Sequence, residues 1–342
     1  MVGVCSYPIS DANMGIEQGG FEFTTDNYID LMNRDDIDII DICTPNFLHK
    51  EIMISALNAG KHINIEKPLA MNLSEAKTLL NAANAHPELI SQICFEYRYT
   101  PAIIRAKQLI EEGFLGKVWS VRAVYLRKSD NKGPVNWKVQ KQYCGGGSLY
   151  DLASHLIDLI RFLLGYFKKI FSKLETFTKE RPAASGSNEM YKVDVDDLAL
   201  LLFEMENGAV RTIESNRVAT GTNNEVRIEI HGEKGAIRFN SMQPNFLYVY
   251  DMRDEVEPIG GRRGYNALET VQRYPKPAAN FPGSTFPIGW IRAHSGNAYD
   301  FIKNIVERTK PILDIRAGYK VQEVIEAASI SDAAKKWVDL PL

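Results

Sequence analysis

The chain has 342 residues, with 40 Lys and Arg against 43 Asp and Glu, which gives a formal net charge of −3; 45% of the residues are apolar and 24% are charged. This composition is ordinary for a globular protein, and the length is sufficient for two domains with full cores. The absence of a basic surplus argues against nucleic acid or an anionic membrane surface as the main partner.

The four cysteines are far apart and form no CxxC pair; they are Cys5, Cys43, Cys94 and Cys144. We therefore expect reduced thiols in a cytoplasmic protein, and no metal site. No apolar run approaches the ~20 residues of a membrane span, and no basic segment followed by an apolar core opens the chain. The sequence therefore predicts no membrane association and no signal peptide.

The first hundred residues alternate between short apolar runs and longer helical patterns. Strands are predicted at residues 1–6, 37–43, 62–65 and 90–95, and helices at 11–18, 24–33, 47–59 and 74–85. This alternation is typical of βαβ units with a parallel sheet. We therefore expect a Rossmann-like α/β domain over residues 1–100, with ligands at the carboxyl ends of its strands.

Residues 101–342 are predicted to form an α+β domain with a large, mostly antiparallel sheet. A helix is predicted at 101–112, strands at 118–126, 169–178, 195–205, 208–218, 225–231 and 235–239, and closing helices at 297–308 and 317–336. Hairpin turns are expected at Asn207-Gly208 and Glu233-Lys234-Gly235, and an irregular stretch at 240–290. Residues 197–203 place apolar side chains on both faces of a strand, so we expect a homo-oligomer, a dimer or a tetramer.

Three glycines, residues 145–147, lead into an apolar helix with few polar side chains. At ~100° per residue Asp151, His155 and Asp158 fall on one narrow stripe of this helix. A carboxylate and an imidazole one turn apart can bind a hydroxyl group and move its proton. The alternative is structural: Ser148 as N-cap with Asp151 in a capping box, and His155 as a core histidine.

Several segments together resemble the glucose–fructose oxidoreductase / inositol dehydrogenase / MocA (Gfo/Idh/MocA) family. They are Cys43-Thr44-Pro45-Asn46-Phe47-Leu48-His49, residues 59–70 with Glu66-Lys67-Pro68, Tyr97-Arg98-Tyr99-Thr100-Pro101, residues 113–116, the Gly145–Asp158 stretch and residues 323–327. The resemblance covers nearly the whole chain. Its most specific part is Glu66-Lys67-Pro68 combined with Asp151-x-x-x-His155.

This resemblance implies an NAD(P)-dependent oxidoreductase, with NAD or NADP as cofactor. It would transfer a hydride between the nicotinamide and a hydroxyl carbon of a sugar, an inositol-like polyol or a sugar derivative. The resemblance implies three catalytic residues, Lys67, Asp151 and His155. His155 would take the hydroxyl proton, Asp151 would orient the imidazole or a neighbouring hydroxyl, and Lys67 would stabilise charge on the oxygen; the roles of Lys67 and His155 can be exchanged.

The resemblance also implies the residues that bind cofactor and substrate. The cofactor residues are Ser6, Thr44, Pro45, Asn46, His49, Glu66, Lys67 and Arg98. A surface ion pair is the alternative for Arg98. Trp137 and Tyr143 are expected to form a substrate wall beside Asp151 and His155, and ordinary packing is the alternative for both aromatic residues.

The sequence departs from the family at its start. No G-x-G-x-x-G follows the first strand, and Gly15, Gly19 and Gly20 have neither the spacing nor the context of that motif. We therefore expect the family's first strand–helix unit, on the order of 30 residues, to be missing. The first strand ends in Ser6-Tyr7, without an acidic residue or an arginine, which leaves NAD and NADP open.

Two other functions are compatible with these residues. A non-catalytic regulatory homologue would keep the fold and bind a nucleotide or a sugar. An NAD-dependent glycosidase would oxidise the sugar transiently to loosen a glycosidic bond.

Overall fold

The computed structural model describes residues 1–128, 132–271 and 289–342. The chain divides into two compact units, Met1–Cys94 with Asp300–Tyr319, and Phe95–Tyr299 with Lys320–Leu342. The domain boundary at residue 100 stays a prediction. Within the described ranges, no helix is long and apolar enough to cross a membrane.

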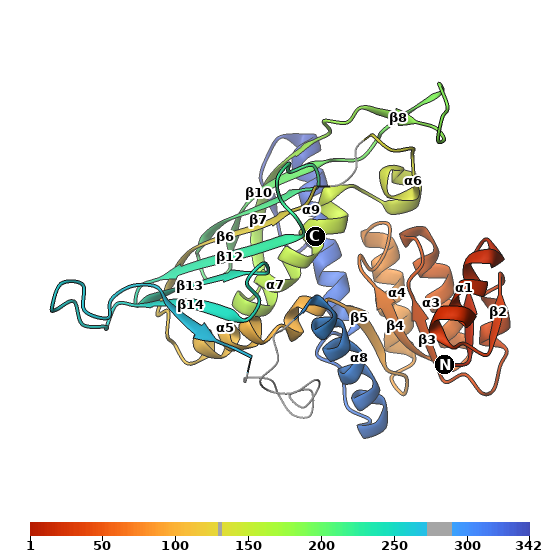
Figure 1. Ribbon diagram of the computed structural model, residues 1–342, viewed down its shortest axis with the longest axis horizontal. Coiled ribbons are helices and arrows are strands. Elements are labelled where there is room, and N and C mark those ends of the chain that lie inside the picture. The colour runs from red at the N-terminus through yellow and green to blue at the C-terminus, as the bar shows by residue number, and fades with distance from the viewer. Residues whose placement is uncertain (129–131, 272–288) are drawn as a thin grey trace. The chain divides into compact units, whose positions relative to one another are not determined.

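The first unit contains five parallel strands and their connecting helices (Figure 1). The strands are β1 (Gly3–Cys5), β2 (Phe23–Thr25), β3 (Ile39–Ile42), β4 (His62–Glu66) and β5 (Ser91–Cys94), and the helices are α1 (Ile9–Gly19), α2 (Ile29–Met32), α3 (His49–Asn58) and α4 (Leu73–Ala85). β1 pairs with β2, and a separate sheet has the order β3-β4-β5. The predicted Rossmann-type α/β fold is therefore confirmed, with its strands in two parallel sheets.

The central strand β4 shows why this sequence forms a buried sheet. Ile63 and Ile65 are fully buried, and the residues that alternate with them, His62, Asn64 and Glu66, are partly exposed. α3 precedes β4 in the chain and ends just before Gly60. The φ of Gly60, 73°, lies in the left-handed region that ends many helices. The apolar run and the glycine stop therefore give this βα unit the boundaries that the sequence predicts.

Two predictions for the start of the chain are wrong. The helix predicted at 24–33 is instead β2 followed by the single turn α2. Phe23 and the two threonines after it have aromatic or β-branched side chains, which favour a strand once β1 is available as a partner. The chain also opens with a strand–helix unit, β1 and α1, so the expected absence of such a unit is corrected. Ser6-Tyr7-Pro8 comes directly after β1, in place of a glycine-rich turn.

The second unit is built around a nine-stranded sheet. Its strands are β6 (Val118–Leu126), β7 (Phe167–Glu175), β10 (Leu198–Met205), β11 (Val210–Asn216), β12 (Glu225–Gly232), β13 (Gly235–Asn240), β14 (Phe246–Asp251), β15 (Asn266–Glu269) and β16 (Val338–Asp339). The order is β15-β14-β13-β12-β6-β11-β10-β7-β16, and every pair is antiparallel except β6 with β11. The mostly antiparallel sheet predicted from the sequence is confirmed.

The turns of this sheet agree with their sequence signals. Asn207-Gly208 joins β10 to β11, and Gly208 has a φ of 80°. Residues 233–234 join β12 to β13. The stretch 240–290, predicted to be irregular, contains β14 and β15, which pair at the sheet edge; its part from 272 to 288 lies outside the described residues.

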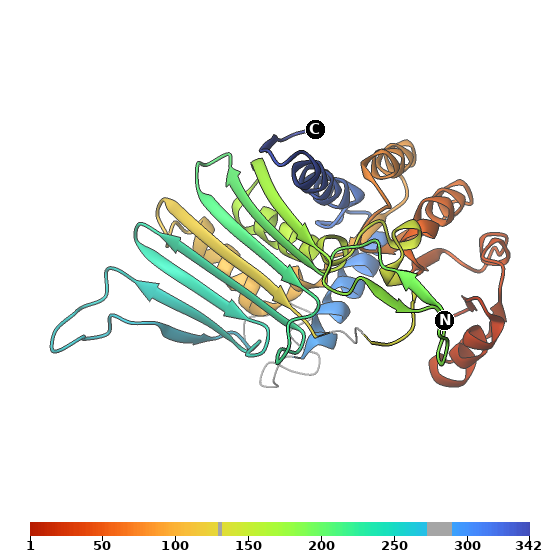
Figure 2. The ribbon, with the colours of Figure 1, turned by 90° about the horizontal axis from the view of Figure 1, so that it is seen from above.

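Helices α5 (Pro101–Glu111) and α7 (Ser154–Leu164) lie along one face of the sheet (Figure 2). The side chains of β10 show that the two faces of the sheet differ in burial. Ala199, Leu201 and Phe203 are buried, whereas Leu200 and Leu202 are 41% and 38% exposed. One face therefore carries the core of this unit, and the other presents apolar side chains to solvent. The remaining elements are β8 (Glu180–Pro182), β9 (Met190–Lys192), α6 (Lys141–Cys144), α8 (Trp290–Glu307) and α9 (Ile315–Ala334).

Candidate active site

The glycine-rich turn before α7 is held by a buried carboxylate, Asp196. Its Oδ1 accepts a hydrogen bond from the N–H of Gly147 and its Oδ2 one from the N–H of Leu149, each at 2.8 Å. The N–H of Ser148 donates to the backbone oxygen of Asp196 at 2.9 Å. Burial raises the pKa of Asp196, and the two N–H donors oppose this shift because they stabilise the charged form.

These hydrogen bonds between the glycine turn and Asp196, here called the clamp, explain why glycine is needed at position 147. A Cβ on Gly147 would lie 1.8 Å from the backbone oxygen of Asp196, so no side chain can be accommodated without moving one of the two strands of backbone. Gly145, with a φ of 79°, supplies the left-handed conformation that starts the turn. The glycines therefore fix where the following helix begins.

The helix itself starts with a π-helical segment, Leu149–Ala153, and continues as α7 from Ser154. Ser148 is already helical and makes no side-chain capping bond; its hydroxyl donates to Oγ of Ser215 at 3.0 Å. The capping-box alternative is therefore wrong. A π turn contains more residues than an α turn, so the constant 100° step does not apply between Asp151 and His155. The narrow stripe predicted for these two residues from a regular α-helix is therefore wrong.

Asp158, the third residue of the predicted stripe, faces Arg98. The Nε and Nη2 atoms of Arg98 donate to the two carboxylate oxygens of Asp158 at 2.7 and 2.5 Å. Both side chains are buried, and the guanidinium lies 4.9 Å from the ring centre of Phe162. The predicted alternative for Arg98 was a surface ion pair, whereas this bidentate pair is internal and ties the chain after β5 to α7.

His155 is buried among three aromatic rings. The ring of Tyr97 meets it edge-on at 5.2 Å, Phe95 does so at 6.1 Å, and Tyr125 lies at 5.8 Å. Nδ1 of His155 is 3.6 Å from Oε2 of Glu96, which is also buried. The imidazole is therefore restrained by rings and faces a carboxylate, a setting compatible with acid–base chemistry.

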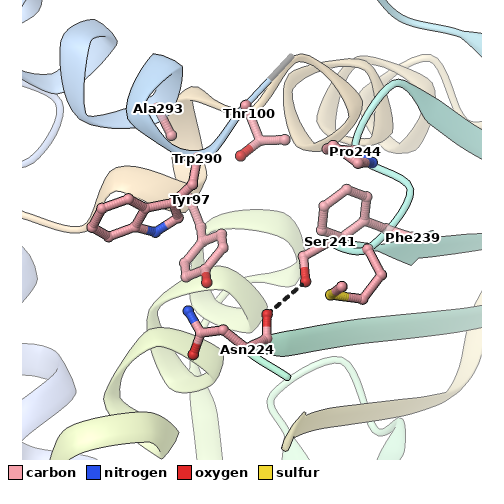
Figure 3. A pocket seen from close by; sticks show the side chains of 10 residues that line it. Tyr97, Thr100, Asn224, Phe239, Ser241, Pro244, Trp290 and Ala293 are labelled. Atoms are coloured by element: carbon pink, nitrogen blue, oxygen red, sulfur yellow. Dashed lines mark hydrogen bonds between the residues drawn. The ribbon is translucent and has the colours of Figure 1, made fainter. Parts of the chain in front are cut away.

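The tyrosines near His155 lead to a cavity of about 200 Å³ in the second unit (Figure 3). The hydroxyl of Tyr97 donates to that of Tyr125 at 3.3 Å, which donates to Oδ1 of Asn224 at 2.9 Å. Tyr97, Asn224 and Trp290 are among the residues that line the cavity. Burial raises the pKa of Tyr97, so its hydroxyl keeps its proton. The cavity therefore combines aromatic walls with a few polar atoms.

At the carboxyl end of β3, the predicted cofactor residues Thr44, Pro45 and Asn46 follow one another. Thr44 and Pro45 are half-buried and Asn46 is buried. Among the described residues, the buried hydroxyl of Thr44 has no hydrogen-bond partner. A buried hydroxyl without a partner is costly unless a ligand or water satisfies it.

At the carboxyl end of β4 stand Glu66 and Lys67, both half-buried. Oε2 of Glu66 accepts a hydrogen bond from the backbone N–H of Lys67 at 3.1 Å. At the end of β1, Ser6 is also half-buried, and its N–H donates to the backbone oxygen of Thr25 at 3.2 Å. The structure thus places these three residues at strand ends, as predicted.

His49 is an internal residue next to these strand ends. It is fully buried, with Nδ1 3.0 Å from the backbone oxygen of Pro68 and Nε2 3.1 Å from that of Thr44. Burial lowers its pKa, so the ring is neutral near pH 7. The ring therefore bridges the segments that follow β3 and β4, and contact of His49 with the cofactor stays a prediction.

Trp137 and Tyr143, the predicted substrate wall, lie in another part of the second unit. Trp137 packs against a small cluster of Val139, Cys144, Val193 and Val195, and the ammonium of Lys138 lies 5.4 Å from its ring centre. Tyr143 is half-buried in α6. Among the described residues, neither lines the cavity of Figure 3, so ordinary packing describes Trp137 better.

Comparisons with known proteins identify the family of this chain. Residues 2–92 match the family described as an oxidoreductase family with an NAD-binding Rossmann fold, and residues 103–238 match the GFO/IDH/MocA C-terminal domain. A levoglucosan dehydrogenase of Pseudarthrobacter phenanthrenivorans is 36% identical over 335 residues, which cover 94% of this chain and 85% of the relative. The chain belongs to the Gfo/Idh/MocA family of oxidoreductases.

Two further similar proteins show how far the likeness extends. A solved structure of levoglucosan dehydrogenase in complex with NADH and levoglucosan has a TM-score of 0.93 and 35% identity, and the match covers 100% of this chain and 90% of that one. A glucose-6-phosphate 3-dehydrogenase of Bacillus subtilis is 26% identical, over 83% of this chain and 76% of the relative. This chain therefore has the fold of a Gfo/Idh/MocA oxidoreductase throughout.

Several residues of this Gfo/Idh/MocA site were not predicted from the sequence. Glu96 directly follows the fourth predicted strand, and a carboxylate at a strand's carboxyl end was a usable signal. Asp196 precedes a long apolar strand, where a charged residue needs a specific partner. Tyr125 and Asn224 gave no such signal, because only the tertiary fold brings them to the Tyr97 hydroxyl.

Substituting Gly147→Ala should destabilise the protein by about 1–3 kcal/mol or more, because the new methyl group overlaps the Asp196 backbone. Urea unfolding followed by circular dichroism measures this. Gly264→Ala is the matched control: a Cβ there meets nothing within 4 Å, so a change within about 0.5 kcal/mol is expected. Equal stability of the two variants would contradict the clamp.

The buried ion pair gives a second prediction. Asp158→Leu and Arg98→Met should each cost about 3–5 kcal/mol, because each leaves the partner's charge buried without compensation. The double variant should be much less destabilised than the sum of the two. Additive losses in a double-mutant cycle would show that the two side chains do not interact in solution.

Proposed function

We propose that this Gfo/Idh/MocA member oxidises a hydroxyl group of a sugar such as levoglucosan to a carbonyl, with NAD as the hydride acceptor. The observation that carries the proposal is the setting of His155. This buried imidazole belongs to the helix that follows the glycine turn, and it faces the carboxylate of Glu96. The names of its relatives support the substrate class, since levoglucosan dehydrogenase has been solved with NADH and levoglucosan. A related anhydrosugar or another pyranose fits this chemistry equally well.

The residues at the strand ends fit a dinucleotide. The buried Thr44 hydroxyl lacks a partner among the described residues, and a polar group of a cofactor would satisfy it. Ser6, Asn46 and Glu66 lie at the ends of β1, β3 and β4, where parallel sheets bind ligands. We propose that these residues, with the backbone of Pro45, hold NAD; when bound, its nicotinamide supplies the hydride acceptor.

The proposed chemistry assigns one task to each catalytic residue. His155 takes the proton of the substrate hydroxyl at Nε2, because its Nδ1 faces Glu96. Lys67 donates a hydrogen bond to the same oxygen and stabilises the negative charge that develops there, and the proton can pass to Lys67 instead. Asp151, half-buried one turn before His155, orients a neighbouring substrate hydroxyl.

Arg98 and the cavity complete this assignment. Two donor nitrogens of Arg98 bind Asp158, so Arg98 holds α7 in place. Only its remaining N–H groups can bind the cofactor. The cavity beside Tyr97 has the aromatic walls that suit the apolar face of a sugar ring, with Asn224 as a polar contact. We propose it as part of the substrate site in place of Trp137, while Tyr143 keeps its predicted role as a hypothesis.

His155→Ala and Lys67→Met should each lower kcat for the sugar by about 10²–10⁴, the usual loss when a general acid–base group is removed. Steady-state rates of NADH formation measure the effect, and fluorescence titration should show unchanged NADH binding to the His155 variant. His231→Ala is the matched control, a partly exposed histidine of β12 for which normal turnover is expected. Full activity of both site variants would refute the assignment.

The exposed sheet face supports a further proposal, a homo-oligomer. Leu200 and Leu202 of β10 and Val210 of β11 share this face by their strand register, and all three are exposed. A partner copy that covers the face would remove these apolar side chains from water.

Light scattering should give a dimer or a tetramer for the wild type. The double variant Leu200→Glu/Leu202→Glu should shift the mass to that of a monomer, because burying two charges opposes association, with an unchanged circular dichroism spectrum. A monomeric wild type would contradict the proposal.

A further inference from the structure

Glu96 is a charged side chain in an interior position. It opens the 3₁₀ turn Glu96–Tyr99 that follows Phe95, and only 4% of its surface is exposed. Burying a carboxylate costs several kcal/mol unless hydrogen bonds and an opposite charge compensate it. A buried glutamate at this point therefore calls for a partner that carries, or can take up, a proton.

Two histidines face the two oxygens of this carboxylate. Oε2 lies 3.6 Å from Nδ1 of His155, and Oε1 lies 3.9 Å from Nε2 of His294. His155 is buried, whereas His294 is 31% exposed and packs edge-on against Trp290 at 4.2 Å. The three side chains thus form a row from the proposed proton acceptor to a partly exposed histidine beside the cavity wall.

The aromatic rings leave His155 few orientations. Phe95 and Tyr97 flank Glu96 in the sequence, and both rings contact the imidazole, as does Tyr125 from β6. The same short turn therefore carries the carboxylate and two of the rings that confine the histidine. In this arrangement Nδ1 is directed to Glu96, and Nε2 lies on the opposite side of the imidazole.

We infer that Glu96 is the positioning residue of His155 in sugar oxidation, an inference that rests on the proposed function. The carboxylate favours the tautomer with the proton on Nδ1, so that Nε2 holds the lone pair that accepts the hydroxyl proton. It then stabilises the imidazolium that forms, as a carboxylate behind a catalytic histidine does in general. No bond to Glu96 forms or breaks in this step, and Nε2 of His294 lies 3.9 Å from its other carboxylate oxygen.

The pH dependence follows from the charged and titratable groups around His155. Glu96 faces the ring directly, and the hydroxyls of the neighbouring Tyr97 and Tyr125 are joined by a hydrogen bond of 3.3 Å. Asp158, three residues further along α7, is neutralised by Arg98. Oxidation needs His155 as a proton acceptor, so kcat should rise with pH. A carboxylate 3.6 Å from the ring stabilises its protonated form, so replacing this carboxylate by an amide should move the rise to lower pH.

The test compares Glu96→Gln with the wild type in full pH profiles. Glu96→Gln should lower kcat by about 10- to 100-fold, the usual cost of losing the group that orients a histidine. The rising limb of the profile should move down by about 1–2 pH units, while KM for the sugar stays within about twofold. Glu96→Asp keeps the charge and should keep the limb near its wild-type pH.

Glu323→Gln is the matched control, because Glu323 is a buried glutamate that pairs with Lys320 at 2.8 Å in α9. Its stability should change, but its pH limb should not. The inference is overturned if Glu96→Gln loses activity while the rising limb of its pH profile stays at the wild-type pH. Glu96 would then have only a structural role.

A measurement on the wild type keeps the inference testable if the Glu96 variants fail to fold. Nitrogen NMR of the labelled protein at neutral pH should show the His155 tautomer with the proton on Nδ1, and a proton on Nε2 would overturn the inference. This readout does not depend on turnover. An inactive wild type with the expected tautomer would therefore count against the proposed function and not against the positioning by Glu96.

Discussion

The bond between the Asp196 carboxylate and the glycine turn is the constraint on which the rest of the site depends. Two backbone N–H groups of the turn donate to this one buried side chain, and the close approach that results leaves room only for glycine at position 147. The turn fixes the start of the π segment and of α7, and hence the positions of Asp151, His155 and Asp158 along it. The pair between Asp158 and Arg98 then ties α7 to the segment after β5, the same segment that supplies two of the aromatic rings and the carboxylate around His155.

Much of the fold could be predicted from the sequence, because most of its strands and helices carry their own local signal. Alternating burial in β4 and β10, the glycine after α3 and the Asn207-Gly208 turn are local features, and the structure agrees with each. The failures were places where distant partners decide. Residues 23–25 become a strand because β1 offers a parallel partner, and β14 and β15 form because β13 offers an edge.

The site was predictable in part for the same reason. Thr44, Asn46 and Lys67 stand at strand ends, a position that follows from the order of strands and helices. The environment of His155 does not follow from spacing, since a π segment breaks the regular helical step and the surrounding side chains come from several separate elements. The spacing also gave no sign that the ring of His49 bridges the two segments that follow β3 and β4, and its contact with the cofactor stays a prediction.

Transfer of a hydride from a sugar carbon to NAD is the central claim for this Gfo/Idh/MocA member. The most direct measurement is incubation of the 342-residue chain with NAD and a panel of carbon-deuterated sugars that includes levoglucosan, followed by mass spectrometry of cofactor and sugar. We predict NADH that carries one deuterium, in an amount equal to the keto sugar formed. Sugars that keep all of their deuterium beside unreduced NAD would contradict the claim and favour a binding protein, and a free sugar released from a glycoside without net NADH would favour a glycosidase.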